Sequence, residues 1–199
     1  MSEAKFTLGL KLPTDPRWVN MAEMSLEDIL TDHAYCEQKA ATSCISLIQK
    51  YPDRKKLVDE LSPIVTEEWG HFRQVLAELN KRNLKLGNQR KDLYVNKLLE
   101  FQKKNANFQT ILLYRLLVFA LIEARSCERF RLLSQNMTDP YFKDFYYKFM
   151  VSEAGHYRLF LDLAKTYYEE EQVKEIWQNI LDYEKEMLKN FEVRGDRIH

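Results

Sequence analysis

The sequence predicts an all-α protein built on a bundle of four long helices. Glycine and proline are scarce, with five of each among 199 residues, whereas hydrophobic residues make up 45% of the chain. Over long segments, apolar residues recur at alternating steps of four and three, which places them on one face of a helix. We find no segment with the period-two alternation of a strand. We therefore expect one helical domain over residues 1–199.

Two segments open the predicted fold. Residues 1–20 are predicted to be an extended lead-in because Pro13 and Pro16 lie there. The first long helix is expected over about 25–50, beginning where Ser25 and Asp28 are spaced like a capping box. Its apolar face carries Leu26, Leu30, His33, Glu37, Ala40, Cys44 and Leu47.

The second helix is expected over about 54–83. Pro63 is either a first-turn proline of a helix that starts near Ser62 or a kink in a longer helix. Residues 84–106 form a connection that is long enough to cross the length of the bundle, with a weaker helical pattern over 91–104.

Three more helices complete the prediction. The third is expected over about 107–135. The fourth is expected over about 139–168, where Asp139 and Pro140 have the order of an N-cap residue and a first-turn proline. An accessory amphipathic helix is expected over about 170–191.

Ionisable residues interrupt the apolar face of each long helix near its middle. Their order is Glu, Glu-x-x-His, Glu, Glu-x-x-His, and they are Glu37, Glu68, His71, Glu123, Glu153 and His156. Glu68 and Glu153 are 85 residues apart, as are His71 and His156, and Glu37 and Glu123 are 86 apart. The pattern indicates a duplicated helix pair. With the long crossover it predicts a ferritin-like four-helix bundle.

This pattern predicts a site for two metal ions. Residues three apart lie on one helix face, so that Glu68 and His71 can bind one ion together, as can Glu153 and His156. Buried charges without partners cost several kcal/mol each, and two divalent ions match four carboxylates. Carboxylate and imidazole ligands suit iron or manganese. Surface Glu–His pairs are the alternative, but their register on the apolar faces argues against it.

Some neighbouring residues compete with these ligands or could orient them. Glu67 could replace Glu68 as the partner of His71, and Glu128 could replace Glu123, but both lie off the apolar face. Glu67, Ser152 and His33 are candidates for orienting a ligand. An exposed Glu67 and a hydrogen-bonded core His33 are the simpler interpretations. Cys36, Cys44 and Cys127 fit small core positions.

Composition narrows the class of protein. The 30 basic and 30 acidic residues balance, which argues against bulk coating of nucleic acid but leaves room for a local basic face. No apolar run reaches the ~20 residues of a membrane span, and we expect no signal peptide. Three cysteines without a CxxC spacing favour free thiols and a cytoplasmic location.

Four segments around these ligands carry a family resemblance: DHAYCEQKAA (32–41), EEWGHF (67–72), LIEARSCERF (121–130) and SEAGHYRLF (152–160). They resemble the bacterial tRNA hydroxylases that act on 2-methylthio-isopentenyladenosine, which are ferritin-like di-iron monooxygenases. The resemblance spans about residues 20–190, and the six ligand positions match.

The resemblance implies a di-iron centre, O2 as co-substrate and an external electron donor, a reductase or a ferredoxin-type protein. It implies hydroxylation of the isopentenyl group of a modified adenosine in tRNA. Basic residues that could contact tRNA phosphates are Lys81, Arg82, Lys85, Arg90, Lys91, Arg125 and Arg129. For any one of them, a solvated surface charge is an equal interpretation. An aromatic side chain would stack on a base, and the sequence does not say which.

Two other functions remain open at this point. The chain could be a ferritin-like or erythrin-like protein that oxidises or handles iron without an organic substrate. It could also be a metal-free helical interaction module.

Overall fold

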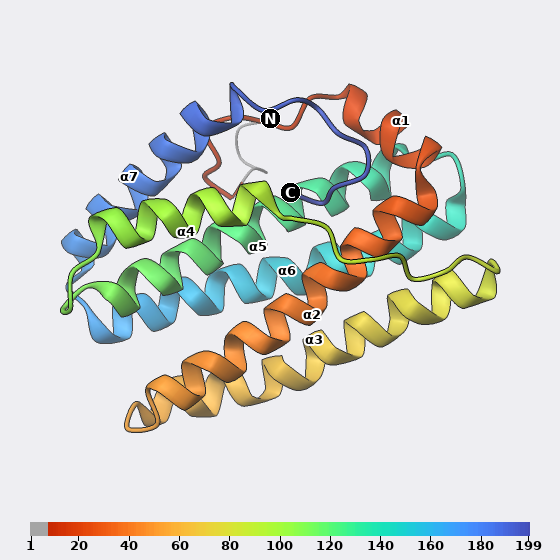
Figure 1. The fold of residues 1–199 in the computed structure, drawn as a ribbon. Helices are drawn as coiled ribbons and strands as arrows, with labels where there is room; N and C mark the ends of the chain where they lie inside the picture. Colours follow the sequence, from red (N-terminus) through yellow and green to blue (C-terminus); the bar gives the residue numbers. More distant parts are fainter. Residues whose placement is uncertain (1–7) are drawn as a thin grey trace. The chain divides into compact units, whose positions relative to one another are not determined.

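The computed structural model describes residues 8–199, which contain seven α-helices and no strand (Figure 1). The prediction of an all-α protein is confirmed. The described chain divides into two compact units. The α2–α3 unit comprises Asn20–Lys91 and Arg194–Ile198, and the α5–α6 unit comprises the residues up to Val19, Asp92–Val193 and His199. We describe each unit by itself.

Helix α1 (Arg17–Met24) begins inside the segment that we predict to be extended. The side chain of Asp15 accepts a hydrogen bond of 2.9 Å from the backbone N–H of Arg17. The backbone carbonyl of Asp15 accepts another, also 2.9 Å, from Trp18. These bonds satisfy N–H groups of the first turn, so a helix can start directly after Pro16. The extended lead-in is therefore wrong from residue 17 onward, and its residues 1–7 lie outside the described part.

The α2–α3 unit is a helical hairpin. Helix α2 (Leu26–Lys50) and helix α3 (Lys55–Lys81) run antiparallel and are joined by residues 51–54 (Figure 1). Ser25 precedes α2, but its side chain makes no capping hydrogen bond, so the predicted capping box does not form. Pro63 lies inside α3, which corresponds to the longer of the two helices that the sequence allows.

The C-terminal segment 194–198 is bound into the α2–α3 unit by Asp32. One carboxylate oxygen of Asp32 accepts from Arg197 at 2.7 Å, and the other accepts from the backbone N–H of Ile198 at 2.8 Å. Gly195 packs so closely on α1 that an added Cβ would clash with the backbone of Met21. Only glycine fits this position without a shift of the backbone.

The α5–α6 unit is a second hairpin with two further helices beside it. Helix α5 (Ile111–Asn136) packs on α6 (Pro140–Tyr167), while α4 (Leu93–Asn105) and α7 (Glu170–Leu188) contact α5. Asp139 caps α6 as predicted, because its side chain accepts from the N–H of Tyr141 at 2.9 Å. Helix α4 occupies the predicted long connection.

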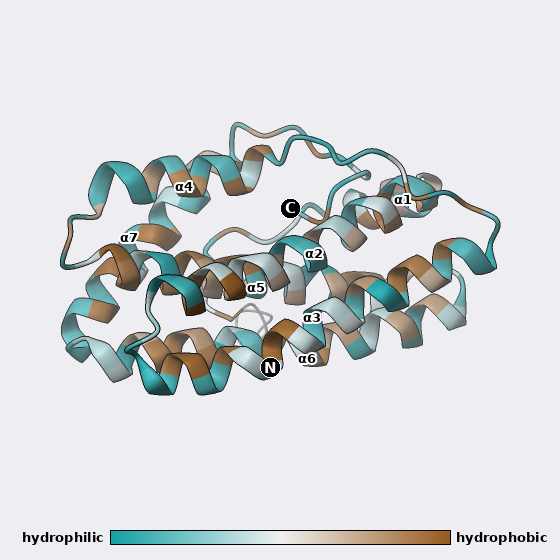
Figure 2. Cartoon of the chain, turned by 60° about the horizontal axis from the view of Figure 1, so that its bottom comes forward, coloured by the Kyte–Doolittle hydropathy of each residue, from teal (hydrophilic) through white to brown (hydrophobic). Residues whose placement is uncertain are grey.

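Helix α5 is buried around most of its circumference, unlike the other long helices. Figure 2 shows teal and brown residues alternating around α3 and α6, as expected for amphipathic helices. In α5 even charged residues outside the predicted apolar face, Arg125 and Glu128, are 1% and 3% exposed. Among the described residues, no helix has the length and apolar character needed to cross a bilayer.

Candidate metal centre

Helices α2 and α3 bring three predicted ligands together. The Glu37, Glu68 and His71 side chains, which we call the α2–α3 cluster, each offer a ligand atom within 4.8 Å of the others. The Nδ1 atom of His71 lies 3.1 Å from Oε2 of Glu68 and 3.4 Å from Oε2 of Glu37. All three residues are buried. Two carboxylates and one neutral imidazole form a donor set that one divalent cation would neutralise.

His33 lies one helical turn before Glu37 and contacts it. The Nε2 atom of His33 is 2.7 Å from Oε1 of Glu37, and the His33 side chain is fully buried. Glu37 therefore has one oxygen facing His33 and the other facing His71. An N–H donor at this position would fix the orientation of the carboxylate.

The two buried carboxylates of the α2–α3 cluster favour a positive charge beside them. Burial of His71 opposes its protonation, but hydrogen bonds that the protonated ring donates to Glu37 and then to Glu68 outweigh this effect and raise the pKa of His71 to about 10. Without a metal ion, a proton on the imidazole thus supplies part of the compensating charge. Glu67 lies at the edge of this cluster, with a side chain 44% exposed and an oxygen 3.9 Å from Nε2 of His71.

Helices α5 and α6 assemble the other three predicted ligands in the same way. Glu123, Glu153 and His156, which we call the α5–α6 cluster, also offer ligand atoms within 4.8 Å of one another. Nδ1 of His156 lies 3.1 Å from Oε2 of Glu153, the same distance as in the other Glu-x-x-His pair. All three residues are buried. Ser152 lies half-buried on α6, directly before Glu153.

Aromatic side chains lie one or two helical turns to either side of the α5–α6 cluster. Phe119 and Phe160 pack edge to face with ring centroids 5.5 Å apart. On the other side, Phe130 and Phe149 pack with centroids 5.7 Å apart. All four rings are at least 92% buried. These pairs exclude water from the helix faces next to the carboxylates, which strengthens electrostatic interactions there.

Glu128, the alternative to Glu123, belongs to a separate buried ion network. Its Oε2 atom lies 2.5 Å from Nη1 of Arg125, and Thr14 donates to both of its oxygens. Arg125 also donates to Glu184 of α7, with its Nη2 2.7 Å from Oε1, and Tyr94 donates to the same oxygen. Burial raises the pKa of Tyr94 well above its usual value. Glu128 is therefore already used as a partner of Arg125.

This network was not predicted from the sequence. One signal was present, because Glu184 follows Ile180 by four residues and precedes Met187 by three, which places it on the apolar face of α7. A carboxylate on such a face needs a buried cation, and Arg125 supplies it.

The predicted tRNA contacts differ in accessibility. Arg125 is 1% exposed and engaged by two carboxylates, so its prediction as a phosphate contact is wrong. Arg82 pairs with Glu78, and Arg90 pairs with Asp28 and Asp196. The exposed cations among the candidates are Lys81, Lys85 and Lys91.

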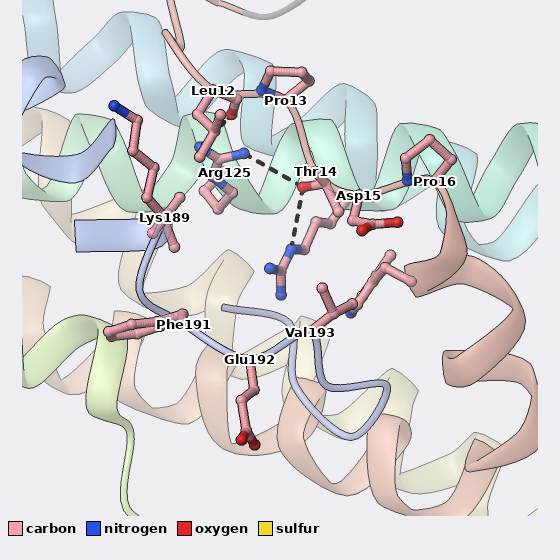
Figure 3. Close-up of a pocket in the computed structure, with 13 residues that line it drawn as sticks. Leu12, Pro13, Thr14, Asp15, Pro16, Arg125, Lys189, Phe191, Glu192 and Val193 are labelled. Atoms are coloured by element: carbon pink, nitrogen blue, oxygen red, sulfur yellow. Dashed lines mark hydrogen bonds between the residues drawn. The ribbon is translucent and has the colours of Figure 1, made fainter. Parts of the chain in front are cut away.

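Arg129 is half-buried at a pocket of about 390 Å³ in the α5–α6 unit (Figure 3). The pocket lies between the segment of residues 12–18, α5 and the segment of residues 188–193. The Arg129 guanidinium lies 4.9 Å from the centre of the Trp18 ring, and its Nε contacts Thr14 at 3.5 Å. The pocket contains none of the predicted metal ligands.

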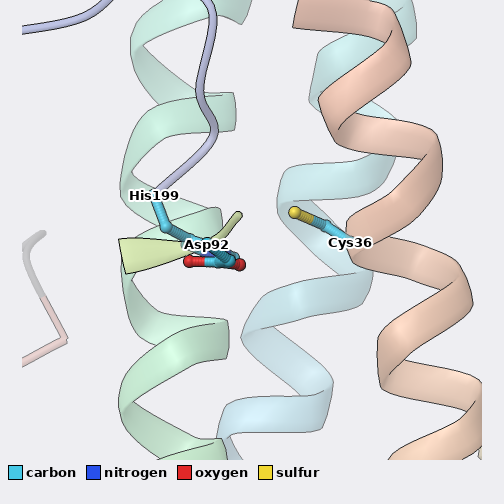
Figure 4. A group of neighbouring side chains, drawn as sticks. All are labelled: Cys36, Asp92 and His199. Atoms are coloured by element: carbon cyan, nitrogen blue, oxygen red, sulfur yellow. The ribbon is translucent and has the colours of Figure 1, made fainter. Parts of the chain in front are cut away.

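One further histidine lies in the α5–α6 unit outside the predicted site. Figure 4 shows His199 beside Asp92, which precedes α4, and the two offer ligand atoms within 4.8 Å; it also draws Cys36 of α2. The Nε2 atom of His199 is 2.8 Å from Oγ of Ser126, and its ring stacks on Tyr94 with centroids 5.3 Å apart. These contacts give His199 a packing role. The three cysteines are free thiols, and burial raises the pKa of Cys127 to about 12.

Two known proteins that resemble this chain in sequence are named as the same enzyme. The chain is 34% identical to the tRNA 2-(methylsulfanyl)-N(6)-isopentenyladenosine(37) hydroxylase of Pseudomonas putida, over 91% of this chain and 87% of the relative. It is 27% identical to the hydroxylase of the same name from Salmonella typhimurium, over 78% of this chain and 75% of the relative.

A solved structure and a family model complete the comparison. The structure is Protein 43 with aldehyde deformylating oxygenase activity from Synechococcus. It superimposes with a TM-score of 0.89 at 32% identity, over 96% of this chain and 94% of that one. This likeness confirms the ferritin-like fold class. The family model described as tRNA-(MS[2]IO[6]A)-hydroxylase (MiaE) matches residues 3–199. The chain therefore belongs to the MiaE family of tRNA hydroxylases.

Proposed function

We propose that this protein hydroxylates the isopentenyl side chain of 2-methylthio-isopentenyladenosine in tRNA, using iron and O2. The observation that carries the proposal is the pair of equivalent buried clusters, each with two carboxylates and one imidazole, in a chain of the MiaE family. A tRNA substrate implies a cytoplasmic reaction.

The six predicted ligands would hold two iron ions. Glu37, Glu68 and His71 would contribute ligands to one ion, and Glu123, Glu153 and His156 to the other. Both Glu-x-x-His pairs orient Nδ1 toward a carboxylate at 3.1 Å, which suits joint binding of a cation. When bound, ferrous iron supplies the electrons and open coordination positions that reductive activation of O2 requires.

The protein's own residues prepare this site in three ways. His33 holds one oxygen of Glu37 and so limits rotation of that carboxylate. Phe119, Phe160 and Phe149 keep water away from the α5–α6 cluster. The buried ion network around Arg125 fixes α5 on its opposite side. The partners that the reaction needs are the prenylated tRNA and a separate electron donor, a reductase or a ferredoxin-type protein.

Two alternative activities can be compared directly. Iron oxidation or storage without an organic substrate is not favoured, because the two curated relatives above are named tRNA hydroxylases. The Synechococcus protein is described as having aldehyde deformylating oxygenase activity, so an aldehyde is the substrate with which to test this second activity. That protein is 32% identical to this chain, close to the 34% of the P. putida hydroxylase.

The test is a reaction with iron-reconstituted protein, a chemical reductant, O2 and tRNA that carries the prenylated nucleoside. We expect the digested tRNA to contain a nucleoside heavier by one oxygen atom, and isotope-labelled O2 to supply that atom. Glu153→Ala, with unchanged helicity, should give no product. Release of formate from an aldehyde without any tRNA product would contradict the proposal.

A further inference from the structure

Helix α3 has an exposed strip that contains no carboxylate. We call it the α3 outer strip; its residues are Ser62, Thr66, Trp69, Arg73, Ala77 and Asn80. Steps of three and four residues place them on one side of the helix, and all six are exposed. The strip is about 27 Å long at 1.5 Å per residue. In a chain with 30 acidic residues, such a surface suits a partner that carries negative charge.

Trp69 is the large apolar residue of the strip. Its side chain is 47% exposed, although tryptophan is usually mostly buried. The indole stacks on Phe72 with ring centroids 4.9 Å apart and an interplanar angle of 26°. Phe72 is itself buried, at 8% exposure, so that it supports the indole from the protein side. Trp69 is thus an exposed aromatic ring whose orientation is fixed before any ligand binds.

Trp69 is also tied by sequence to the α2–α3 cluster. It follows Glu68 directly and precedes His71 by two residues on the same continuous helix. Trp69 therefore lies on the same stretch of α3 as two of the proposed ligands, on the side of the helix that faces solvent.

Arg73 adds a cation one helical turn beyond Trp69. It is exposed, and no ion pair of Arg73 with a carboxylate occurs among residues 8–199. An aromatic ring next to a cation, with hydroxyl and amide groups along the same strip, is the combination that binds single-stranded nucleic acid. A protein partner would instead be expected to meet a wider apolar surface than one indole.

We propose that the α3 outer strip binds the anticodon loop of the tRNA, with Trp69 stacking on an unpaired base and Arg73 contacting a phosphate. The inference rests on the proposed function, which requires a loop nucleotide to reach the iron centre. Stacking of the neighbouring base on a fixed ring would hold the loop while the prenyl group enters.

The first experiment measures binding of an anticodon stem-loop RNA to iron-loaded wild type, Trp69→Ala and Trp69→Phe. Loss of one stacking contact lowers affinity between about fivefold and 150-fold, so we expect this for Trp69→Ala. Trp69→Phe should stay within about threefold of wild type because it retains a ring. The matched control is Phe108→Ala, which removes an aromatic side chain that is 97% exposed but lies outside the strip.

Fluorescence gives a second readout that a merely structural role would not affect. The chain has three tryptophans; Trp18 is 1% exposed and Trp177 is half-buried. Stacking of a base on Trp69 should quench the wild-type emission on RNA addition, and this quenching should disappear in Trp69→Phe while binding persists. For Arg73→Gln, the slope of log affinity against log salt should fall by about 0.7, the value for one single-strand phosphate.

Two results would overturn the inference. The first is equal RNA affinity of wild type and Trp69→Ala when both retain iron and helicity. The second is a lower solution mass of Trp69→Ala with unchanged RNA affinity, which would assign the strip to contact with a second copy of the chain. Failure of the proposed function gives a different result, namely an iron-loaded wild type that binds the RNA and hydroxylates no tRNA nucleoside.

Discussion

The α2–α3 and α5–α6 clusters have the same ligand geometry but different surroundings. In both, Nδ1 of the histidine lies 3.1 Å from the glutamate three residues before it. One turn before the other glutamate, however, α2 has His33 where α5 has Phe119. Likewise Ile64 and Val75 of α3 correspond to Phe149 and Phe160 of α6. Beside the Glu-x-x-His contact that both clusters share, the α2–α3 cluster has the His33–Glu37 contact, whereas packed aromatic rings lie beside the α5–α6 cluster.

The two copies of the motif thus have different neighbours, a buried histidine in one and packed aromatic rings in the other. Hydrogen bonding fixes the Glu37 carboxylate through a single contact of 2.7 Å, which one substitution can remove. Near Glu123 and Glu153, packing is distributed over four aromatic rings and a buried ion network. We therefore expect a single substitution beside the ligands to change metal affinity more in the α2–α3 cluster than in the α5–α6 cluster.

The largest effect should come from removing a ligand of either cluster. His71→Ala and His156→Ala should each lower metal affinity by more than ~100-fold, because even residues that only orient ligands contribute ~10–100-fold. Turnover should be lost in both, while circular dichroism shows unchanged helicity. Full activity of either variant would show that its histidine is not a required metal ligand and that the two clusters do not have the same role.

Breaking the ion network behind α5 should have the next largest effect, and it acts on stability. Arg125→Ala leaves Glu128 and Glu184 buried without their cation, which costs ~3–5 kcal/mol. Thermal unfolding should then shift down by roughly 6–20 °C, at ~2–4 °C per kcal/mol for a chain of this size. The exposed Lys55–Asp59 pair is the control, and Lys55→Ala should cost at most ~1 kcal/mol. Similar losses of stability in Arg125→Ala and Lys55→Ala would show that the buried ion network does not stabilise the fold.

His33→Ala should have a smaller effect that is confined to metal binding. It removes the contact to Glu37 and should lower metal affinity by ~10–100-fold with little change in helicity. His33→Gln, which keeps an N–H donor, should recover part of the loss. Isothermal titration with Mn²⁺ under the same conditions compares the variants. Equal affinities of His33→Ala and wild type would show that packing alone orients Glu37.

The smallest effect is a difference in the rate of alkylation between Cys127 of the α5–α6 unit and Cys36 of the α2–α3 unit. Burial raises the pKa of Cys127 from 9.0 to about 12, with a contribution from the charge of Glu153. Because only the thiolate reacts, Cys127 in the folded protein should resist alkylation up to about pH 10 and should react rapidly once the chain is unfolded. Half-buried Cys36 of α2 should be modified first. Mass spectrometry of peptides after timed alkylation checks the order, and early modification of Cys127 would contradict it.

Features that depend on local residue patterns could be predicted from the sequence. The six proposed ligands could be found because a charge on an apolar face is visible in a strict four-and-three pattern, and because the pattern repeats after 85 residues. The cap at Asp139 depends on adjacent residues only, and it was predicted correctly. Local patterns also gave the order of the long helices.

Features that depend on distant contacts could not be predicted in this way. Arg125 was misread as a surface cation because its partner Glu184 lies 59 residues away on α7. The start of α1 depends on Asp15 capping a helix directly after a proline, which the pattern did not distinguish from extended chain. The exposure of Trp69 agrees with its position off the apolar face, but its stacking on Phe72 depends on side-chain packing that the pattern does not give.

The central claim is that each cluster contributes ligands for one metal ion of a pair. Anaerobic titration of the metal-free protein with ferrous ion, followed by measurement of bound iron per chain, tests it most directly. If each cluster holds one ion, we expect two iron ions per wild-type chain and fewer than two after substitution of either His71 or His156. One ion per wild-type chain, or two ions retained in both variants, would contradict it.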